Sequence, residues 1–97
     1  MSSSAENVER PRAVRVRVTP HELAVALEDG RTIAVPLAWY PRLAHATAEE
    51  RDGWTLIGGG TGIHWADADE DISVDALLQG LPSGESRASF ERWLARR

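Results

Sequence analysis

Five carboxylates lie close together in the stretch DADEDISVDALLQG, residues 67–80. The alternating aspartates Asp67, Asp69 and Asp71 match the first three ligand positions of a calcium-binding loop, which surrounds its ion with oxygen atoms. Such a loop also needs glycine at its sixth position and a bidentate glutamate at its twelfth. This chain has isoleucine and leucine at those two positions, so the spacing predicts at most a weak site for a divalent ion.

The same stretch has the features of the start of a short helix. Ser73 is suited to be the N-cap residue, and Ile72 and Leu77 have the spacing of a hydrophobic staple. Carboxylates at the start of a helix are stabilised by its dipole, by about 0.3–1 kcal/mol each, and Gly80 followed by Pro82 ends such a helix. We therefore interpret the acidic run mainly as a structural signal. The alternative is a partner-binding surface formed by Asp67, Asp69, Glu70 and Asp71.

Other residue types that carry chemistry are absent from the sequence or scattered along it. The chain has no cysteine, which excludes disulfides and thiolate metal sites. Its histidines, His21, His45 and His64, share no metal-ligand spacing, and no serine has the sequence context of a catalytic triad. Only His64, close in sequence to Asp67 and Asp69, is kept as a catalytic candidate. We expect a protein that is not an enzyme and that binds no metal or cofactor.

Charge is distributed unevenly along the 97 residues, a length that fits one small domain. The net charge is −4, and residues 43–85 hold one arginine against nine acids. An acidic segment repels phosphate backbones and suits a basic protein partner, because summed charge steers association. Nucleic acid is therefore disfavoured as the main ligand. No apolar run has the length of a signal peptide or a membrane span, so we expect a cytoplasmic protein without membrane association.

Residues 13–18, AVRVRV, alternate apolar side chains with Arg15 and Arg17. A period of two predicts a half-buried strand with the valines on one face and the arginines on the other. The ordinary role of charged residues on such a face is contact with water. The alternative is a nucleic-acid-binding surface in which these two arginines act together with Arg92 and Arg96 near the C-terminus.

Two more strands are predicted from the residues that follow. One lies around residues 23–27 and the other at residues 32–35, and Asp29-Gly30 between them suits a tight hairpin turn. The first third of the chain therefore predicts an antiparallel three-stranded meander. A sheet this small has free edges, so pairing with a second copy as a homodimer stays open.

The middle of the chain is expected to contain short helices and a second hairpin. One helix is predicted to begin near Pro41, and another, with a capping box of Thr47 and Glu50, to end by Gly53. The strands WTLI and IHW then flank a glycine-rich loop, residues 58–62. This loop lacks the lysine and the following helix of a P-loop. Its glycines are interpreted as hairpin residues with positive φ angles, or as a site where another backbone approaches closely.

Large aromatic side chains mark the expected core and a C-terminal helix. Trp54 and Trp65 flank the glycine-rich loop in apolar strands and are predicted to be structural. The segment SRASFERWLARR, residues 86–97, predicts an amphipathic helix of about three turns. Because so short a helix is marginal alone, its apolar stripe must pack either on its own domain or on a partner. The stripe consists of Phe90, Trp93 and Leu94.

Residues 39–80 resemble domain-of-unknown-function family 2442 in an ordered set of motifs: YPRL, ATAEER, WTLIGGGTGIHW, and DEDIS followed by LLQG. With the preceding strands and the EDGR turn, the resemblance covers about residues 13–81. Ala66 stands where family members often have proline after the tryptophan, and Ala68 stands at the position before DEDIS, where they often have an apolar residue. The resemblance implies a small bacterial α+β protein, often encoded beside a small toxin-like protein, and by that analogy an antitoxin-like role.

These features predict an α+β protein with a flexible tail over residues 1–12, a domain over residues 13–81, and a linker with a helix over residues 82–97. The expected elements are an N-terminal antiparallel three-stranded meander, short helices, a second glycine-linked hairpin, a short capped helix and a C-terminal amphipathic helix. We predict a non-enzymatic interaction module that binds a small basic, toxin-like protein through its acidic run and the stripe of its last helix. The alternative is a nucleic-acid-binding or transcription-regulatory protein that uses the terminal arginines.

Overall fold

The computed structural model describes residues 10–97 of the chain. Its first part is a three-stranded antiparallel sheet, the N-terminal sheet, in which β2 (Glu22–Leu27) pairs with both β1 (Ala13–Val18) and β3 (Thr32–Pro36). Gly30, with a φ angle of 96°, lies in the turn between β2 and β3. The predicted meander is therefore confirmed. Most of the predicted flexible tail, residues 1–9, lies outside the described residues.

One detail of β1 differs from the predicted alternation. Val14 is 51% exposed, whereas Ala13 and Val16 are buried. The register between β1 and β2 shifts between Ala13 and Arg15, as happens where one extra residue bulges out of an antiparallel ladder. The bulge takes Val14 off the face that it would otherwise share with Val16. The prediction that all the valines of this strand lie on one face is wrong at this position.

A second three-stranded antiparallel sheet, the C-terminal sheet, consists of β4 (Trp54–Ile57), β5 (Gly62–Trp65) and β6 (Glu70–Ser73), with β5 in the centre. β4 and β5 form the predicted glycine-linked hairpin. β6 was not predicted, because the acidic run was interpreted as the approach to a helix. It becomes a strand since β5 offers it a free edge, and Ile72, opposite Ile63, is buried there.

The helices within residues 10–97 are short, and the ends predicted for α3 (Ala48–Asp52) and α4 (Val74–Gln79) are confirmed. Thr47 and Glu50 form the predicted capping box of α3. Ser73 accepts a hydrogen bond from the Ala76 amide at the start of α4, and Gly80 ends α4 with a φ angle of 74°. The 3-10 helix η1 (Leu37–Trp39) was not predicted. None of the described helices is long and apolar enough to cross a membrane. The helical segments are η1 (Leu37–Trp39), α2 (Pro41–Ala44), α3 (Ala48–Asp52), α4 (Val74–Gln79) and α5 (Arg87–Ala95).

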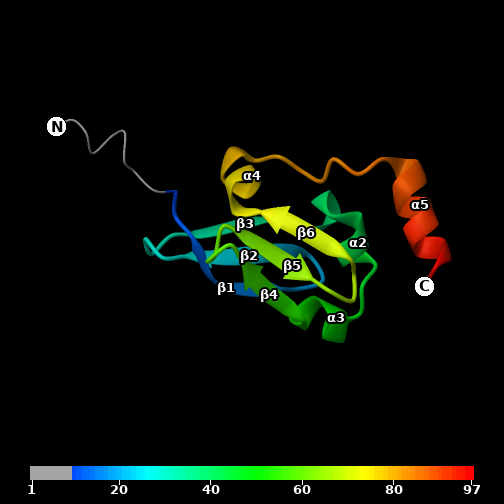
Figure 1. Ribbon diagram of the computed structural model, residues 1–97, viewed down its shortest axis with the longest axis horizontal. Helices are drawn as coiled ribbons and strands as arrows, with labels where there is room; N and C mark the ends of the chain where they lie inside the picture. The colour runs from blue at the N-terminus through cyan, green and yellow to red at the C-terminus, as the bar shows by residue number, and fades with distance from the viewer. Residues whose placement is uncertain (1–9) are drawn as a thin grey trace.

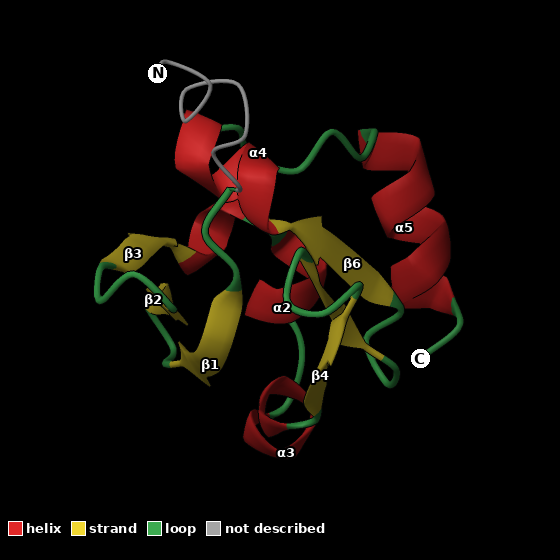
Figure 2. Ribbon diagram, turned by 60° about the vertical axis from the view of Figure 1, so that its left-hand side comes forward, coloured by secondary structure: helices red, strands yellow, loops and turns green. Residues whose placement is uncertain are grey.

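The two sheets form separate layers (Figure 2), and apolar side chains from both contribute to one core. Trp65 is fully buried in this core, and its indole N–H donates a hydrogen bond to the carbonyl oxygen of Arg51 at 3.0 Å. Trp54 is partly buried against the same core. Both tryptophans are therefore structural, as predicted.

The glycine-rich loop between β4 and β5 connects the two sheets. Gly58, Gly59 and Gly60 all have positive φ angles, a conformation that glycine adopts without steric cost. A β-carbon on Gly60 would lie 2.6 Å from the carbonyl oxygen of Ala13. The amide of Ala13 donates a hydrogen bond to the Gly60 carbonyl at 2.8 Å. The loop thus combines the two structural roles predicted for it, a hairpin turn and a close backbone contact.

α5 lies at one end of the molecule, near α2, and is joined to α4 by a linker, residues 81–86 (Figure 1). The linker is fastened to the residues that precede α2. The Tyr40 hydroxyl donates to the Leu81 carbonyl at 3.1 Å, and the Ser83 amide donates to the Trp39 carbonyl at 3.0 Å. These contacts hold the linker beside β6, where the acidic residues lie.

Candidate functional site

Asp67 and Asp69 lie in an exposed loop between β5 and β6, and Glu70 and Asp71 follow them as the first two residues of β6. Ala68 is fully buried beneath this loop, while Asp67, Asp69 and Asp71 are exposed. Asp69 has a φ angle of 52°, and its amide donates to the Ala66 carbonyl at 3.3 Å. This left-handed conformation is uncommon outside glycine but is tolerated by aspartate. Because Ala68 anchors the loop and β6 is paired with β5, the three aspartate carboxylates are directed outward from defined positions.

Arg42, in α2, links this loop to the linker before α5. Its Nη1 atom donates to the Asp69 carbonyl oxygen at 2.8 Å and lies 3.3 Å from the carboxylate of that residue. Its Nε atom lies 2.9 Å from each carboxylate oxygen of Glu85, and its Nη2 atom donates to the same carboxylate. The side chains of Arg42 and Glu85 are only 13% and 12% exposed. Hydrogen bonds from Arg42 lower the pKa of the Glu85 carboxyl group, which keeps this pair charged.

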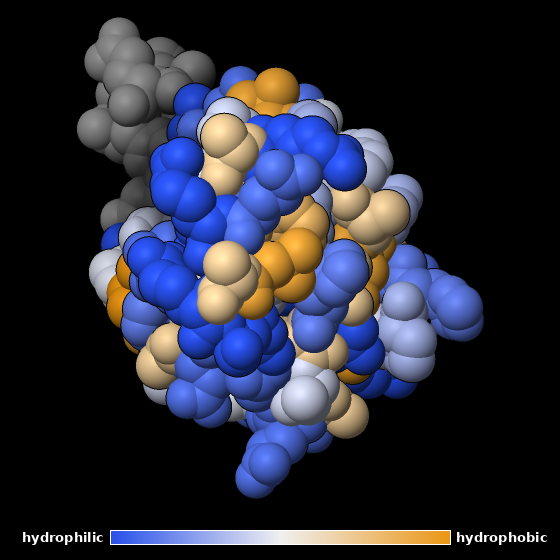
Figure 3. Space-filling model, turned by 90° about the vertical axis from the view of Figure 1, so that its right-hand side faces the viewer, coloured by the Kyte–Doolittle hydropathy of each residue, from blue (hydrophilic) through white to orange (hydrophobic). Residues whose placement is uncertain are grey.

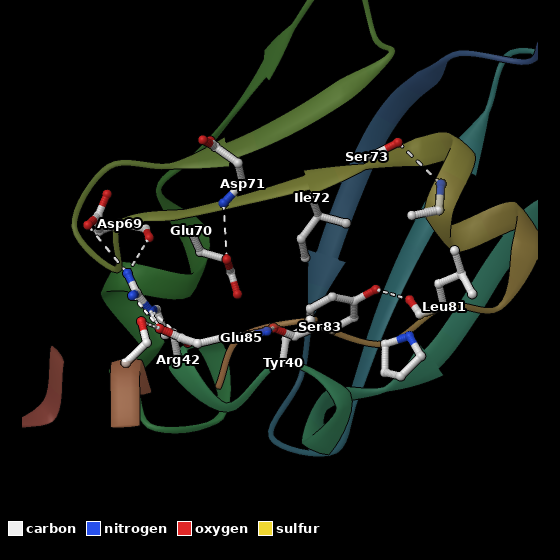
Figure 4. Close-up of a pocket in the computed structure, with 14 residues that line it drawn as sticks. Tyr40, Arg42, Asp69, Glu70, Asp71, Ile72, Ser73, Leu81, Ser83 and Glu85 are labelled. Atoms are coloured by element: carbon white, nitrogen blue, oxygen red, sulfur yellow. Dashed lines mark hydrogen bonds and ion pairs between the residues drawn. The ribbon is translucent and has the colours of Figure 1, made fainter. Parts of the chain in front are cut away.

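A pocket of about 490 Å³ opens between β6, the linker and the residues around the start of α2 (Figure 4). Pockets of this size hold small ligands or single side chains. Figure 4 shows Arg42 and Glu85 at one end and an apolar wall with Tyr40, Ile72 and Leu81 at the other. Four acidic residues and one arginine are among the lining residues, and of these Asp71 directs its side chain away from the pocket, toward His64. The pocket therefore combines an apolar side with an acidic end.

Glu70 points into this pocket from β6 (Figure 4). It shares a face of the strand with Ile72, because side chains two residues apart point the same way. Its Oε1 atom accepts a hydrogen bond from the Asp71 amide at 3.2 Å. Its Oε2 atom is buried and has no hydrogen-bond partner among the described residues. Burial raises the pKa of Glu70 from 4.5 to about 7, because the ionised carboxylate loses hydration there.

His64 is paired with an aspartate on the outer face of the C-terminal sheet. The sequence placed it close to Asp67 and Asp69, but its partner in the structure is Asp71, which lies directly opposite on β6. The His64 Nδ1 atom is hydrogen-bonded to the Asp71 carboxylate. Cross-strand pairing brings these two side chains to the same face, whereas Asp67 and Asp69 belong to the loop. Residues 10–97 contain no group of three or more side chains that could hold a metal ion.

The apolar stripe of α5 packs on its own domain. Trp93 is 3% exposed, and Phe90 and Leu94 are partly buried against the core. The ring centroids of Phe90 and His45 are 5.2 Å apart. The guanidinium carbon of Arg97 lies 4.5 Å from the centroid of the Trp93 ring, a favourable cation–π distance. The sequence left open whether this helix packs on its own domain or on a partner, and the structure shows it packed on its own domain.

The four arginines of the nucleic-acid hypothesis fall into two groups. Arg15 and Arg17 line a groove of about 340 Å³ on the N-terminal sheet. Arg92 and Arg96 are exposed on and just after α5, at the other end of the molecule (Figure 1). The surface at the end that carries α5 is mostly hydrophilic, with a small apolar area near the middle of the view (Figure 3). In the described part of the chain, the four arginines do not form one continuous basic surface.

No pattern in the sequence indicates that Tyr40, Arg42 and Glu85 contribute to a site. Arg42 and Glu85 are 43 positions apart, and their pairing depends on the path of the linker past α2. The weak local signal is a single glutamate in a linker of small, apolar and proline residues. A charged residue at such a position gains its role only through a distant partner.

Comparisons with known proteins identify relatives whose own function is also open. Residues 13–83 match the family described as protein of unknown function (DUF2442). The crystal structure of a protein of unknown function from Rhodospirillum rubrum is similar with a TM-score of 0.69 and 29% identity, covering 82% of this chain and 96% of that chain. The solution NMR structure of an uncharacterised protein from Chromobacterium violaceum is similar in fold, with a TM-score of 0.64 and 19% identity, covering 96% of this chain and 79% of that chain. No curated protein matches the chain.

Proposed function

This chain belongs to the DUF2442 family of proteins of unknown function, and we propose that it is a non-enzymatic interaction module that binds a small basic protein. The proposed contact surface is the acidic face, defined as Asp67, Asp69, Glu70 and Asp71. The observation that carries the proposal is the outward presentation of the three aspartate carboxylates, with Glu70 directed into the pocket beside them. Ala68 is buried beneath the loop, and Arg42 holds the Asp69 backbone from the side.

A surface that is ordered before binding supports tight association. The loop loses little conformational freedom when a partner docks, and lost freedom is a main cost of association. Exposed carboxylates at defined positions complement a basic surface, which accelerates encounter and fixes the orientation of the partner. The Arg42–Glu85 pair stabilises this arrangement from within, because it joins α2, the loop and the linker.

The nature of the partner follows from charge and from the family resemblance. The negative charge of the acidic face is complementary to lysine and arginine side chains on the partner. The resemblance described above implies a small toxin-like protein encoded nearby, so we place this chain as its antitoxin-like partner, with both proteins in the cytoplasm. Trp93 is buried against its own domain, so Phe90, Trp93 and Leu94 would take part only if α5 left that position. The proposed contact therefore centres on the acidic face.

A second candidate function is nucleic-acid binding at the groove on the N-terminal sheet. Arg15 and Arg17 stand beside a floor that includes Ala24 and Ala26, and small side chains allow a phosphate backbone to approach. Binding of this kind weakens steeply with salt. A mobility-shift titration at about 50 mM salt, where phosphate binding is strong, is expected to show a shift that is lost in an Arg15→Gln, Arg17→Gln variant. No shift at this salt concentration would remove this alternative.

Co-expression with the product of the adjacent reading frame tests the proposed function. We expect that product to inhibit growth alone and to be neutralised by this protein. A variant with Asp67→Asn, Asp69→Asn and Asp71→Asn is expected to lose neutralisation. The matched control removes the same charge elsewhere, at three exposed glutamates, and is expected to keep neutralisation. The proposal is wrong if the neighbour is harmless, or if it stays toxic beside the unmodified protein. The control substitutions are Glu28→Gln, Glu49→Gln and Glu91→Gln.

A further inference from the structure

Glu70, which lines the pocket, carries an unsatisfied acceptor. Its Oε2 atom is buried without a hydrogen-bond partner among the described residues, and leaving a charged acceptor unpaired costs more than leaving a neutral one. Arg42, the cation of the pocket lining, already donates to the Asp69 carbonyl and to both oxygens of Glu85. A ligand that brings N–H donors and a positive charge would therefore satisfy Glu70.

The rest of the pocket suits an organic cation with a short carbon chain. Tyr40, Ile72 and Leu81 form an apolar wall beside Glu70 (Figure 4), along which a methylene chain can pack. Carboxylates outnumber guanidinium groups in the lining, which disfavours an anionic ligand. Because the described residues hold no cluster of three metal-ligating side chains, an ammonium or guanidinium group fits better than a metal ion.

We propose that this pocket, with Glu70 at its centre, binds an ammonium or guanidinium group, supplied by a lysine or arginine side chain of the basic partner. This inference rests on the proposed function and deepens it, because it assigns one anchoring side chain of the partner to one pocket. The exposed aspartates steer and orient the partner, and the pocket takes a single side chain out of water. Buried, well-packed contacts of this kind dominate the affinity of many interfaces.

The binding is expected to depend on pH, because Glu70 must be ionised to hold a cation. The titratable side chains that face it are Tyr40, Arg42 and Glu85, and the charge of Asp71 acts on it from the other face of β6. With a pKa of about 7 in the free protein, the ionised fraction rises about tenfold between pH 6 and pH 8. Affinity for the cation is expected to rise by a similar factor over this range.

An NMR titration with N-acetyl-arginine amide and N-acetyl-lysine amide tests the pocket directly. At pH 8 we expect saturable shifts at the amides of Ile72 and Tyr40, with N-acetyl-norleucine amide as the neutral control probe. Glu70→Gln should weaken binding about 10- to 100-fold, the range for a lost hydrogen bond to a charged group. The control variant Glu28→Gln should bind as the unmodified protein does. Equal shifts in Glu70→Gln, or none at pH 8, would overturn the pocket assignment.

Partner binding separates this inference from the function on which it rests. If Glu70→Gln binds the partner as well as the unmodified protein does, while the triple aspartate variant loses it, the interaction module stands and the pocket assignment falls. In that case Glu70 acts as an inward-pointing charge that prevents pairing of the edge strand β6 with other chains. If the amides bind the pocket but no basic partner binds, the source of the cation is a free amine, and the partner-anchor assignment falls.

Discussion

Glu70→Gln is expected to stabilise the protein at alkaline pH and to have little effect at acidic pH. The pKa of Glu70 is raised from 4.5 to about 7, so the folded state holds this proton more tightly than the unfolded state does. The stability that comes from the protonated carboxyl group is therefore lost as pH rises from about 4.5 to about 7. A glutamine stays neutral over the whole pH range, so the variant does not lose this contribution to stability.

The size of this effect follows from the pKa shift and from the exposure of the side chain. At about 1.4 kcal/mol per pKa unit, the full shift corresponds to about 3 kcal/mol. Because Glu70 is only partly buried, water screens part of this term. We expect Glu70→Gln to raise the free energy of unfolding by about 1–2 kcal/mol at pH 8 and by less than about 0.5 kcal/mol at pH 5.

Urea denaturation at pH 5 and pH 8 measures this difference. Every other pH-dependent contribution affects the unmodified protein and the variant alike, so the difference between them isolates Glu70. Glu28→Gln, an exposed position on the turn after β2, is the control and should show no pH-dependent difference. An effect of Glu70→Gln that is equal at both pH values would refute the assignment of a raised pKa to this residue.

Three further substitutions test the fold and the link between the site and the core. Trp65→Ala should lower the free energy of unfolding by about 3–5 kcal/mol, as for a large aromatic residue removed from a core; a variant that melts normally but loses partner binding would instead mark a surface contact. Gly60→Ala should cost more than about 2 kcal/mol in a urea titration, because its β-carbon would meet the Ala13 backbone, whereas Gly84→Ala, with open space around it, should be nearly neutral. Arg42→Gln should cost about 3 kcal/mol by leaving the nearly buried Glu85 carboxylate without its cationic partner, and hydrogen exchange should show faster opening of α5; unchanged exchange there would contradict the linking role of Arg42.

The ends of the helices could be predicted because their signals are local. Thr47 with Glu50, Ser73 as an N-cap and Gly80 as a stop each act within one helical turn, and the structure has each in that role. The same holds for the hairpin turn at Gly30, where a positive φ angle requires a residue without a side chain. Helix ends and tight turns, which depend on neighbouring residues, can therefore be predicted from the sequence.

Features that depend on distant residues could not be predicted. β6 has one buried apolar residue, Ile72, and becomes a strand through its pairing with β5. The exposure of Val14 follows from a bulge opposite β2, which no local pattern indicates. The burial of Glu70 and the pairing of Arg42 with Glu85 arise where β6, α2 and the linker meet. The acidic run could be identified as a candidate surface, but the pocket behind it depends on tertiary contacts.

The affinity of the purified protein for the product of the adjacent reading frame, with and without Asp67→Asn, Asp69→Asn and Asp71→Asn, tests the acidic face most directly. Exposed ion pairs contribute about 0.2–1 kcal/mol each, so neutralising three carboxylates should weaken binding about tenfold. The difference should shrink in high salt, because salt screens exposed charges. The charge-matched variant of Glu28, Glu49 and Glu91 should bind as tightly as the unmodified protein. Equal affinity of the aspartate variant and the unmodified protein at low salt would contradict the proposed contact surface.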